Sequence, residues 1–232
     1  MKNSIALVLV LLFGVFLFHI LRQYKTQETL NKTANYYNVN TPSEVGAANV
    51  VTAIVVTYRG LDTLGEVTVL FLTAMILGYI LRHGGKEKAT KNNTSEILIT
   101  AANVLIPGSI VLGIYVFING HLTPGGGFQG GAIIGTAITL MVLANPTRTI
   151  REAMLHMVES ISGFFYVLLG LAGLLFAGGF LDNRILPLGT LGDLFSAGAI
   201  PLIYSLIGLK VGTEISSIIA NINETGNNNV QL

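Results

Sequence analysis

Residues 46–82 read GAANVVTAIVVTYRGLDTLGEVTVLFLTAMILGYILR, and this stretch decides the fold because two apolar runs meet in it at a charged join. The run before the join, Val45–Val56, has 12 residues without a charge, and the run after it, Val67–Leu81, has 15. At about 1.5 Å of rise per residue, helices of these lengths extend roughly 18 and 22 Å, whereas the hydrocarbon core is about 30 Å thick. We therefore expect that neither run crosses a bilayer alone and that the join lies at depth or just inside one interface.

The charged join, residues 59–66, carries Arg59, Asp62 and Glu66. Ionisable side chains inside a membrane are costly, usually face protein or a water-filled cavity, and mark ion or proton pathways. One carboxylate has no basic partner within the join, so it is protonated, binds a cation or pairs with another subunit. We expect Asp62 and Glu66 to exchange ions or protons, with transient Na⁺ near them and Arg59 as their partner. The alternative is a structural ion pair between Arg59 and Asp62 that fixes a helix break.

The composition is that of a membrane protein. The chain is 51% hydrophobic and 11% charged, with a mean hydropathy of +0.67, whereas a soluble domain carries about 25% charged residues. The absence of cysteine excludes disulfides, thiolate-held zinc and iron–sulfur clusters within this chain, and the four histidines lack metal-ligand spacing. We therefore expect no resident metal or cofactor. The net charge of +1 gives no reason to propose nucleic-acid binding.

The apolar segments predict an all-α integral membrane protein with six or seven transmembrane segments, one pair of them short and broken around residues 58–66. No small-x-small cleavage site follows the first segment, so we expect a retained helix and not a signal peptide. The polar breaks predict a module at 1–82, a linker at 83–96, a four-helix module at 97–220 and a polar tail at 221–232. The expected long segments lie at about 4–21, 97–119, 128–145, 161–181 and 194–220.

Basic residues in the short loops predict the orientation, because cytoplasmic loops are enriched in lysine and arginine. The linker region 82–96 has four basic residues and the expected loop 146–160 has two, whereas the loop 120–127 has none. We expect the C-terminus in the cytoplasm of a cell-membrane protein and the glycine-rich loop outside. The side of the N-terminus stays open, since it depends on whether residues 45–57 cross the bilayer.

Two long motifs carry a family resemblance. GAANVVTAIVVTYRGLDTLGEVTVLF resembles the C-terminal part of the A subunit of Mrp-type Na⁺/H⁺ antiporters, and more closely the small E-type subunit of membrane-bound hydrogenases and sulfane sulfur reductases. Residues 97–220 resemble the Mrp B subunit, through the HLTPGGGFQGG motif at 121–131 and the IGLKV motif at 207–211. The chain departs from this pattern at Thr57, where relatives often place an acidic residue, so an identical cation site does not follow.

The resemblance implies a non-redox membrane subunit of a multi-subunit Na⁺/H⁺ antiport module, inactive by itself and helping to form a sodium or proton path. It implies A/D-, C-, F- and G-type subunits as partners within the bilayer, together with a hydrogenase or iron–sulfur peripheral arm. Two alternatives stay open: a subunit of a stand-alone Mrp antiporter, and a purely structural subunit of a membrane arm.

Lys210 is a second candidate for the ion path. It lies inside the apolar segment 194–220, with Glu214 one helical turn later. The expected start of this helix near residue 194 would place Lys210 past the bilayer midpoint, where its side chain could snorkel toward the cytoplasmic interface. The alternative is a local ion pair between Lys210 and Glu214, although lysine before glutamate is the weaker i, i+4 order.

The loop 120–131 is expected to have a structural role. Its glycines permit a tight re-entry into the next helix and close packing of neighbouring backbones. A phosphate-binding loop would need a preceding strand, and here an apolar segment precedes it. His121 is a candidate proton relay, with interfacial hydrogen bonding as the alternative, and Asn49 is expected to cap a helix or bond across helices. The structural motif comprises Pro124, Gly125, Gly126, Gly127, Phe128, Gly130 and Gly131.

Overall fold

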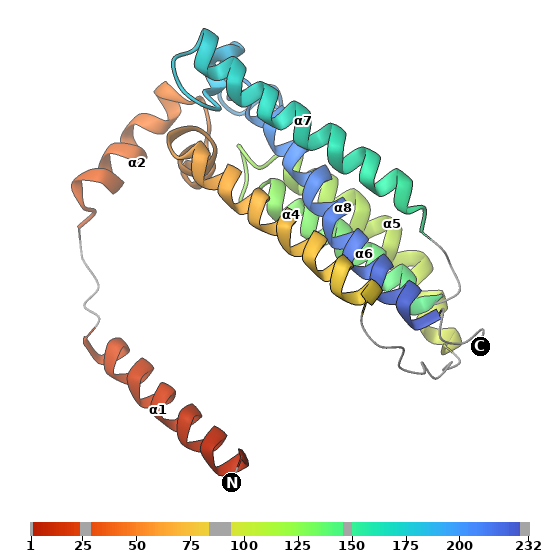
Figure 1. Ribbon diagram of the computed structural model, residues 1–232. Coiled ribbons are helices and arrows are strands. Elements are labelled where there is room, and N and C mark those ends of the chain that lie inside the picture. Colours follow the sequence, from red (N-terminus) through yellow and green to blue (C-terminus); the bar gives the residue numbers. More distant parts are fainter. Residues whose placement is uncertain (1, 24–28, 84–93, 146–149, 228–232) are drawn as a thin grey trace. The chain divides into compact units, whose positions relative to one another are not determined.

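The computed structural model describes residues 2–23, 29–83, 94–145 and 150–227, and every regular element among them is a helix (Figure 1). The chain divides into two units, 1–36 and 37–232. The first unit holds α1 (Lys2–Gln23), whose described side chains are exposed. Helix α2 (Lys32–Glu44) lies in the connector and continues into the second unit. Most of the expected linker and part of the polar tail lie outside the described residues.

Six of the described helices are long and apolar enough to cross a membrane, which confirms the expected all-α membrane fold. The apolar stretch of each is 18 to 25 residues long. These helices are α1, α4 (Gly60–His83), α5 (Glu96–Ile118), α6 (Gly127–Ala144), α7 (Glu152–Phe176) and α8 (Ile200–Asn227).

The expected helix break is present, but only its first part is short. The first run forms α3 (Val50–Thr52) and the π-helix η1 (Ala53–Tyr58), which ends at Arg59 with φ −131° and ψ 40°. Helix α4 then begins at Gly60 and takes in the rest of the charged join, so the expectation that the second run fails to cross alone is wrong. The reason is that charged residues can continue a helix, and Asp62 in the first turn of α4 favours its N-terminus through the helix dipole.

Two other helix boundaries differ from those expected. Helix α7 begins at Glu152, so part of the expected 146–160 loop is helical. Helix α8 begins at Ile200, because residues 186–199 form irregular backbone that includes positive φ angles at Gly189, Gly192, Ala197 and Gly198. Lys210 is therefore ten residues, or about 15 Å, from the start of its helix and near the middle of the membrane-length stretch Ile200–Asn223.

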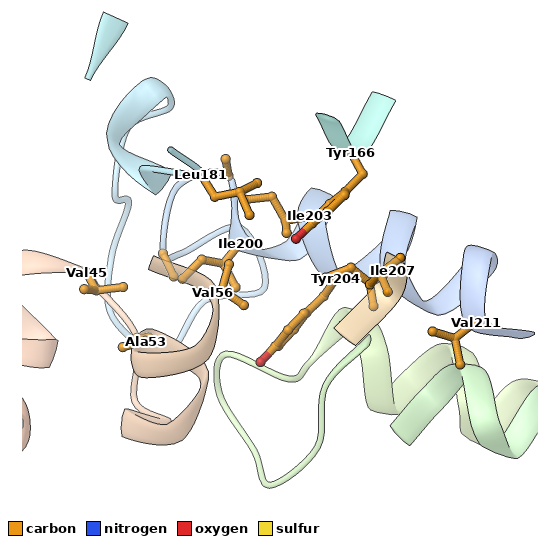
Figure 2. Packing of buried hydrophobic residues seen from close by; sticks show 14 residues of the cluster. Val45, Ala53, Val56, Tyr166, Leu181, Ile200, Ile203, Tyr204, Ile207 and Val211 are labelled. Atoms are coloured by element: carbon orange, nitrogen blue, oxygen red, sulfur yellow. The ribbon is translucent and has the colours of Figure 1, made fainter. Parts of the chain in front are cut away.

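Helix α8 is the centre of the second unit and contacts α4, α5, α6 and α7 (Figure 1). Helices α5 and α6 also pack together closely. Figure 2 shows one hydrophobic core to which residues of both expected modules contribute, so residues 45–67 and the C-terminal module fold against each other. The buried residues labelled there are Val45, Ala53, Val56, Tyr166, Leu181, Ile200, Ile203, Tyr204, Ile207 and Val211.

The glycine-rich motif lets α6 enter between α5 and α8 at backbone distance. A methyl group at Gly130 would lie 2.5 Å from the Gly113 carbonyl oxygen of α5. One at Gly131 would lie 2.7 Å from the Gly208 carbonyl oxygen of α8. Both gaps are too short for any side chain, so these positions need glycine for close approach of the helices. This geometry supports the structural role expected for the motif.

Candidate functional site

The charged join forms an ion pair at the start of α4. Arg59 Nη2 lies 2.5 Å from Asp62 Oδ2, and both side chains are more than half exposed on this chain. The alternative considered for the pair, a local contact that fixes the break, is therefore present in the structure. An exposed pair of this kind contributes little to stability, about 0–1 kcal/mol.

Glu66 lies one turn after Asp62 on the same exposed face of α4. It forms no ion pair with any of the described residues, whose pairs at this end of α4 are limited to Arg59 with Asp62. Charged side chains are costly when they face lipid, by about 2.5–3.5 kcal/mol on insertion scales. The face of α4 that carries Asp62 and Glu66 therefore points to a neighbouring subunit or a water-filled space.

The break beneath the join is held by polar contacts. Thr63 Oγ1 donates to the Val55 carbonyl at 2.5 Å and thereby ties α4 to η1. Tyr58 donates to a Glu44 carboxylate oxygen at 2.6 Å, and its ring packs at 4.7 Å from that of Tyr37 in the connector. Thr57, where relatives often have an acidic residue, buries its hydroxyl, which has no hydrogen-bond partner within the described part of the chain.

The loop at 120–123 is bonded to the first broken helix. Asn49 accepts from the amides of Val51 and Thr52, as a helix cap, and its amide group donates to the carbonyls of Gly120 and Thr123, each at 2.9 Å. Both roles expected for Asn49 are thus confirmed. Thr52 also donates to the Gly120 carbonyl at 2.6 Å and accepts from the Tyr204 hydroxyl at 3.1 Å.

His121 is fully buried within this network. Its backbone carbonyl accepts from the amides of Ala48 and Asn49, and its Nε2 lies 3.3 Å from the Asp193 carbonyl. Burial lowers the pKa of His121 below its ordinary value of 6.5, and hydrogen bonds to backbone carbonyls oppose this only in part. The imidazole is therefore neutral at pH 7 and placed to hold the loop, which agrees with the hydrogen-bonding alternative; a relay role for it stays a prediction.

This lowered pKa predicts a pH dependence of the loop. The folded state binds fewer protons than the unfolded state between the lowered pKa and 6.5, so the stabilisation is complete above pH 6.5 and is lost as the pH falls below it. We expect faster hydrogen exchange of residues 118–123 at pH 5.5 than at pH 7.5, after correction for intrinsic rates. His121→Gln should reduce this pH difference, and an equal difference in both proteins would contradict the prediction.

A second set of ionisable side chains lies buried at the centre of the bundle. Lys210 Nζ is 2.6 Å from Glu214 Oε1 on α8 and 3.9 Å from Glu159 Oε1 on α7. It also lies 4.7 Å from the ring centroid of Phe71 on α4, a cation–π distance. We call Glu159, Lys210 and Glu214 the Lys210 cluster. The expected local ion pair is present, and the expectation that Lys210 snorkels is wrong because its side chain is only 11% exposed and turns inward.

Two members of this region, Glu159 and its neighbour His156, are not among the residues that the sequence pattern singled out. Glu159 is buried, and one of its carboxylate oxygens lies 3.4 Å from His156 Nδ1. The signal for them is the i, i+3 spacing of a histidine and a glutamate ahead of an apolar segment. The expected loop at 146–160 includes both residues, because the apolar run of α7 begins only after them.

Comparison with known proteins follows the two halves of this structure. Residues 97–217 match the family described as "Domain related to MnhB subunit of Na+/H+ antiporter". The chain belongs to this family. Residues 2–96 match a second family, MbhE, which is described as the E-type subunit of MBH. The expected fusion of an E-type and a B-type subunit is confirmed.

Solved structures and curated relatives agree with this assignment. The MnhB-related chain is 41% identical to a chain of the membrane-bound sulfane sulfur reductase, an archaeal respiratory membrane complex, with a TM-score of 0.79 over 95% of this chain and 97% of that one. A chain of the Mrp complex from Dietzia sp. DQ12-45-1b shares the fold, with 23% identity and a TM-score of 0.77 over 96% of this chain and 26% of that one. Uncharacterized protein MJ1307 of Methanocaldococcus jannaschii is 31% identical over 73% of this chain and 74% of its own length.

Proposed function

We propose that this MnhB-related chain is a non-redox membrane subunit of a cation/proton antiport module, within a respiratory complex of the sulfane sulfur reductase or membrane-bound hydrogenase kind. The observation that carries the proposal is the unpaired Glu66 beside the Arg59–Asp62 pair, on an exposed face of a membrane-length helix. The likeness to the sulfane sulfur reductase chain over nearly the whole of both chains supports the assignment to such a complex.

The role of the join follows from its charges. Two carboxylates share one guanidinium, so the join carries an excess negative charge that a cation or a proton neutralises. Asp62 is held by Arg59, which leaves Glu66 as the group that exchanges its proton or ion. Arg59 limits the affinity of the site, since a second positive charge nearby opposes tight cation binding. The face that carries Glu66 meets an antiporter-type neighbour of the A/D, C, F or G kind.

The orientation is part of the same proposal. The glycine-rich loop lies outside the cell, and the end of the bundle at which α4 ends and α7 begins faces the cytoplasm, with the C-terminus of α8. Lysine and arginine in the sequence near this end support the assignment.

Purification of the intact complex through a tag on the C-terminus tests which kind of assembly holds this subunit. We expect antiporter-type membrane subunits together with subunits that bind iron–sulfur clusters, recognised by iron content and by the electron paramagnetic resonance of the reduced clusters. A complete antiporter assembly with no iron would contradict the respiratory assignment and establish the stand-alone antiporter. An assembly that contains redox subunits but transports no cation would leave only the structural role.

A further inference from the structure

A cavity of about 420 Å³ lies between α4, α7 and α8. Its walls include Phe71 and Gly78 of α4, His156 and Glu159 of α7, and Ser217 and Asn221 of α8. A space of this size holds several water molecules, and hydroxyl, amide, imidazole and carboxyl groups on its walls provide hydrogen-bonding partners for them. It differs from the charged join in both helix contacts and depth.

The cavity leads to the Lys210 cluster. Glu159 belongs both to the cavity wall and to the cluster, since its Oε1 lies 3.9 Å from Lys210 Nζ. Behind it, the Glu214 side chain is fully buried, and its Oε2 has no hydrogen-bond partner among the described residues. The cluster therefore runs from a hydrated wall to a carboxylate with no access to water.

The charges of the cluster do not balance. Lys210 supplies one positive charge, whereas Glu159 and Glu214 supply two negative charges when both are ionised. An uncompensated buried charge is costly, and such a site commonly takes up a proton instead. No group of three or more histidine or acidic side chains in the described part of the chain is arranged to hold a metal ion. The chemistry therefore favours a proton over a metal ion.

The depth of the cluster suits a half-channel. Glu159 is seven residues, or about 10 Å, from the start of α7, and Lys210 is about 15 Å from the start of α8. Glu66 lies on the other side of Phe71 along α4, five residues or about 7.5 Å away. The cavity thus extends from the end where α4 ends and α7 begins toward the level of Lys210, whereas the charged join lies at the opposite end of α4.

We propose that Glu159 is a proton-binding site loaded through this cavity, with Lys210 shared between Glu159 and Glu214. A proton from cavity water adds to the Glu159 carboxylate, Lys210 then pairs with Glu214 alone, and the cluster becomes neutral. Release returns the proton to water and restores the shared ammonium group. The groups around Glu159 are His156 of α7, Lys210 and Glu214 of α8, and Tyr79 of α4, which lines the same cavity. This inference rests on the proposed antiport function and adds a proton site to it.

Cysteine labelling tests whether water reaches the cavity, and the absence of native cysteine makes the chain suited to it. Ser217 lines the cavity, whereas the neighbouring Ser216 is buried and donates to the Gly212 carbonyl. In membranes holding the whole complex, we expect a small charged methanethiosulfonate reagent to label Ser217→Cys but not Ser216→Cys. Mass spectrometry of this subunit separates its labelling from that of other chains. No labelling of Ser217→Cys, or equal labelling at both positions, would overturn the proposal.

Transport by the whole complex tests the proton site itself. We expect Glu159→Gln to lower proton-coupled cation transport by about 100-fold, the lower range for loss of a positioned proton-transfer group. Glu159→Asp should retain transport with a shifted pH profile, which also covers the case in which the glutamine variant fails to assemble. If Glu159→Gln and Glu159→Asp keep the wild-type rate and pH profile while Glu66→Gln is inactive, this inference fails and the proposed function stands. If the wild-type complex itself moves no cation, the proposed function fails.

Discussion

Replacing Lys210 with methionine is expected to destabilise the subunit by about 3–5 kcal/mol, because breaking a buried ion pair leaves an uncompensated charge in an apolar interior. Lys210 is the cation that the structure places against both buried carboxylates, Glu214 at 2.6 Å and Glu159 at 3.9 Å. Methionine has a similar length and keeps most of the packing against Phe71. The loss should appear as a lower midpoint for heat-induced dissociation of the purified complex, followed by size-exclusion chromatography.

The double variant Lys210→Met, Glu214→Gln is the control for this charge effect. Removing the charge of the fully buried Glu214 should restore a large part of the lost stability, since a neutral amide does not require a counter-ion. A Lys210→Met complex as stable as the wild type would contradict the buried ion pair. Equal losses in the single and double variants would show that packing, and not charge, determines the effect.

Gly130→Ala is the second large effect that we expect. The added methyl group would lie 2.5 Å from the Gly113 carbonyl oxygen and 2.9 Å from Phe117 Cβ, so α5 and α6 must move apart. Overpacking of this kind costs about 1–3 kcal/mol and more where backbone is involved. We expect a reduced yield of assembled complex and a lower dissociation midpoint.

Gly108→Ala on α5 is the matched control for this glycine, since nothing lies within 4 Å of a methyl group there. Alanine is favoured over glycine in a helix interior by about 1 kcal/mol, so Gly108→Ala should leave stability unchanged or raise it. If both alanine variants assemble as well as the wild type, the close approach of α5 and α6 at Gly130 is not required.

Much of the fold could be predicted from the sequence, because long apolar segments and a charged interruption are local signals. The positions of five spans and the break at Arg59 came from such signals. Boundaries inside mixed sequence were less accessible. Residues 152–160 contain charged and polar side chains and read as a loop, yet they form the first turns of α7 because α8 and the cavity wall receive Glu159.

The candidate site was only partly accessible for the same reason. Arg59 and Asp62, or Lys210 and Glu214, are neighbours on one helix, so their pairing follows from their spacing. The contact of Lys210 with Glu159 joins residues about 50 positions apart, and no local pattern encodes it. The same holds for the bond between Tyr204 and Thr52, which links the two halves of the chain.

The shared core gives a physical reason for the fusion of the two halves. Val45, Ala53 and Val56 are buried against Leu181 and Ile200, so the short helices α3 and η1 complete the C-terminal bundle and do not form a separate core (Figure 2). A covalent connection keeps this interface at a 1:1 ratio. It also fixes the charged join at one end of the bundle and the Lys210 cluster near its middle.

The most direct test of the account is cation transport by vesicles that hold the whole complex, comparing wild type with Glu66→Gln. The control is Glu96→Gln, an exposed glutamate in the first turn of α5 that takes no part in the join. We predict that Glu66→Gln abolishes transport with every subunit present, while Glu96→Gln transports as the wild type does. Transport unchanged by Glu66→Gln would contradict an ion path through the charged join and leave it as a structural break.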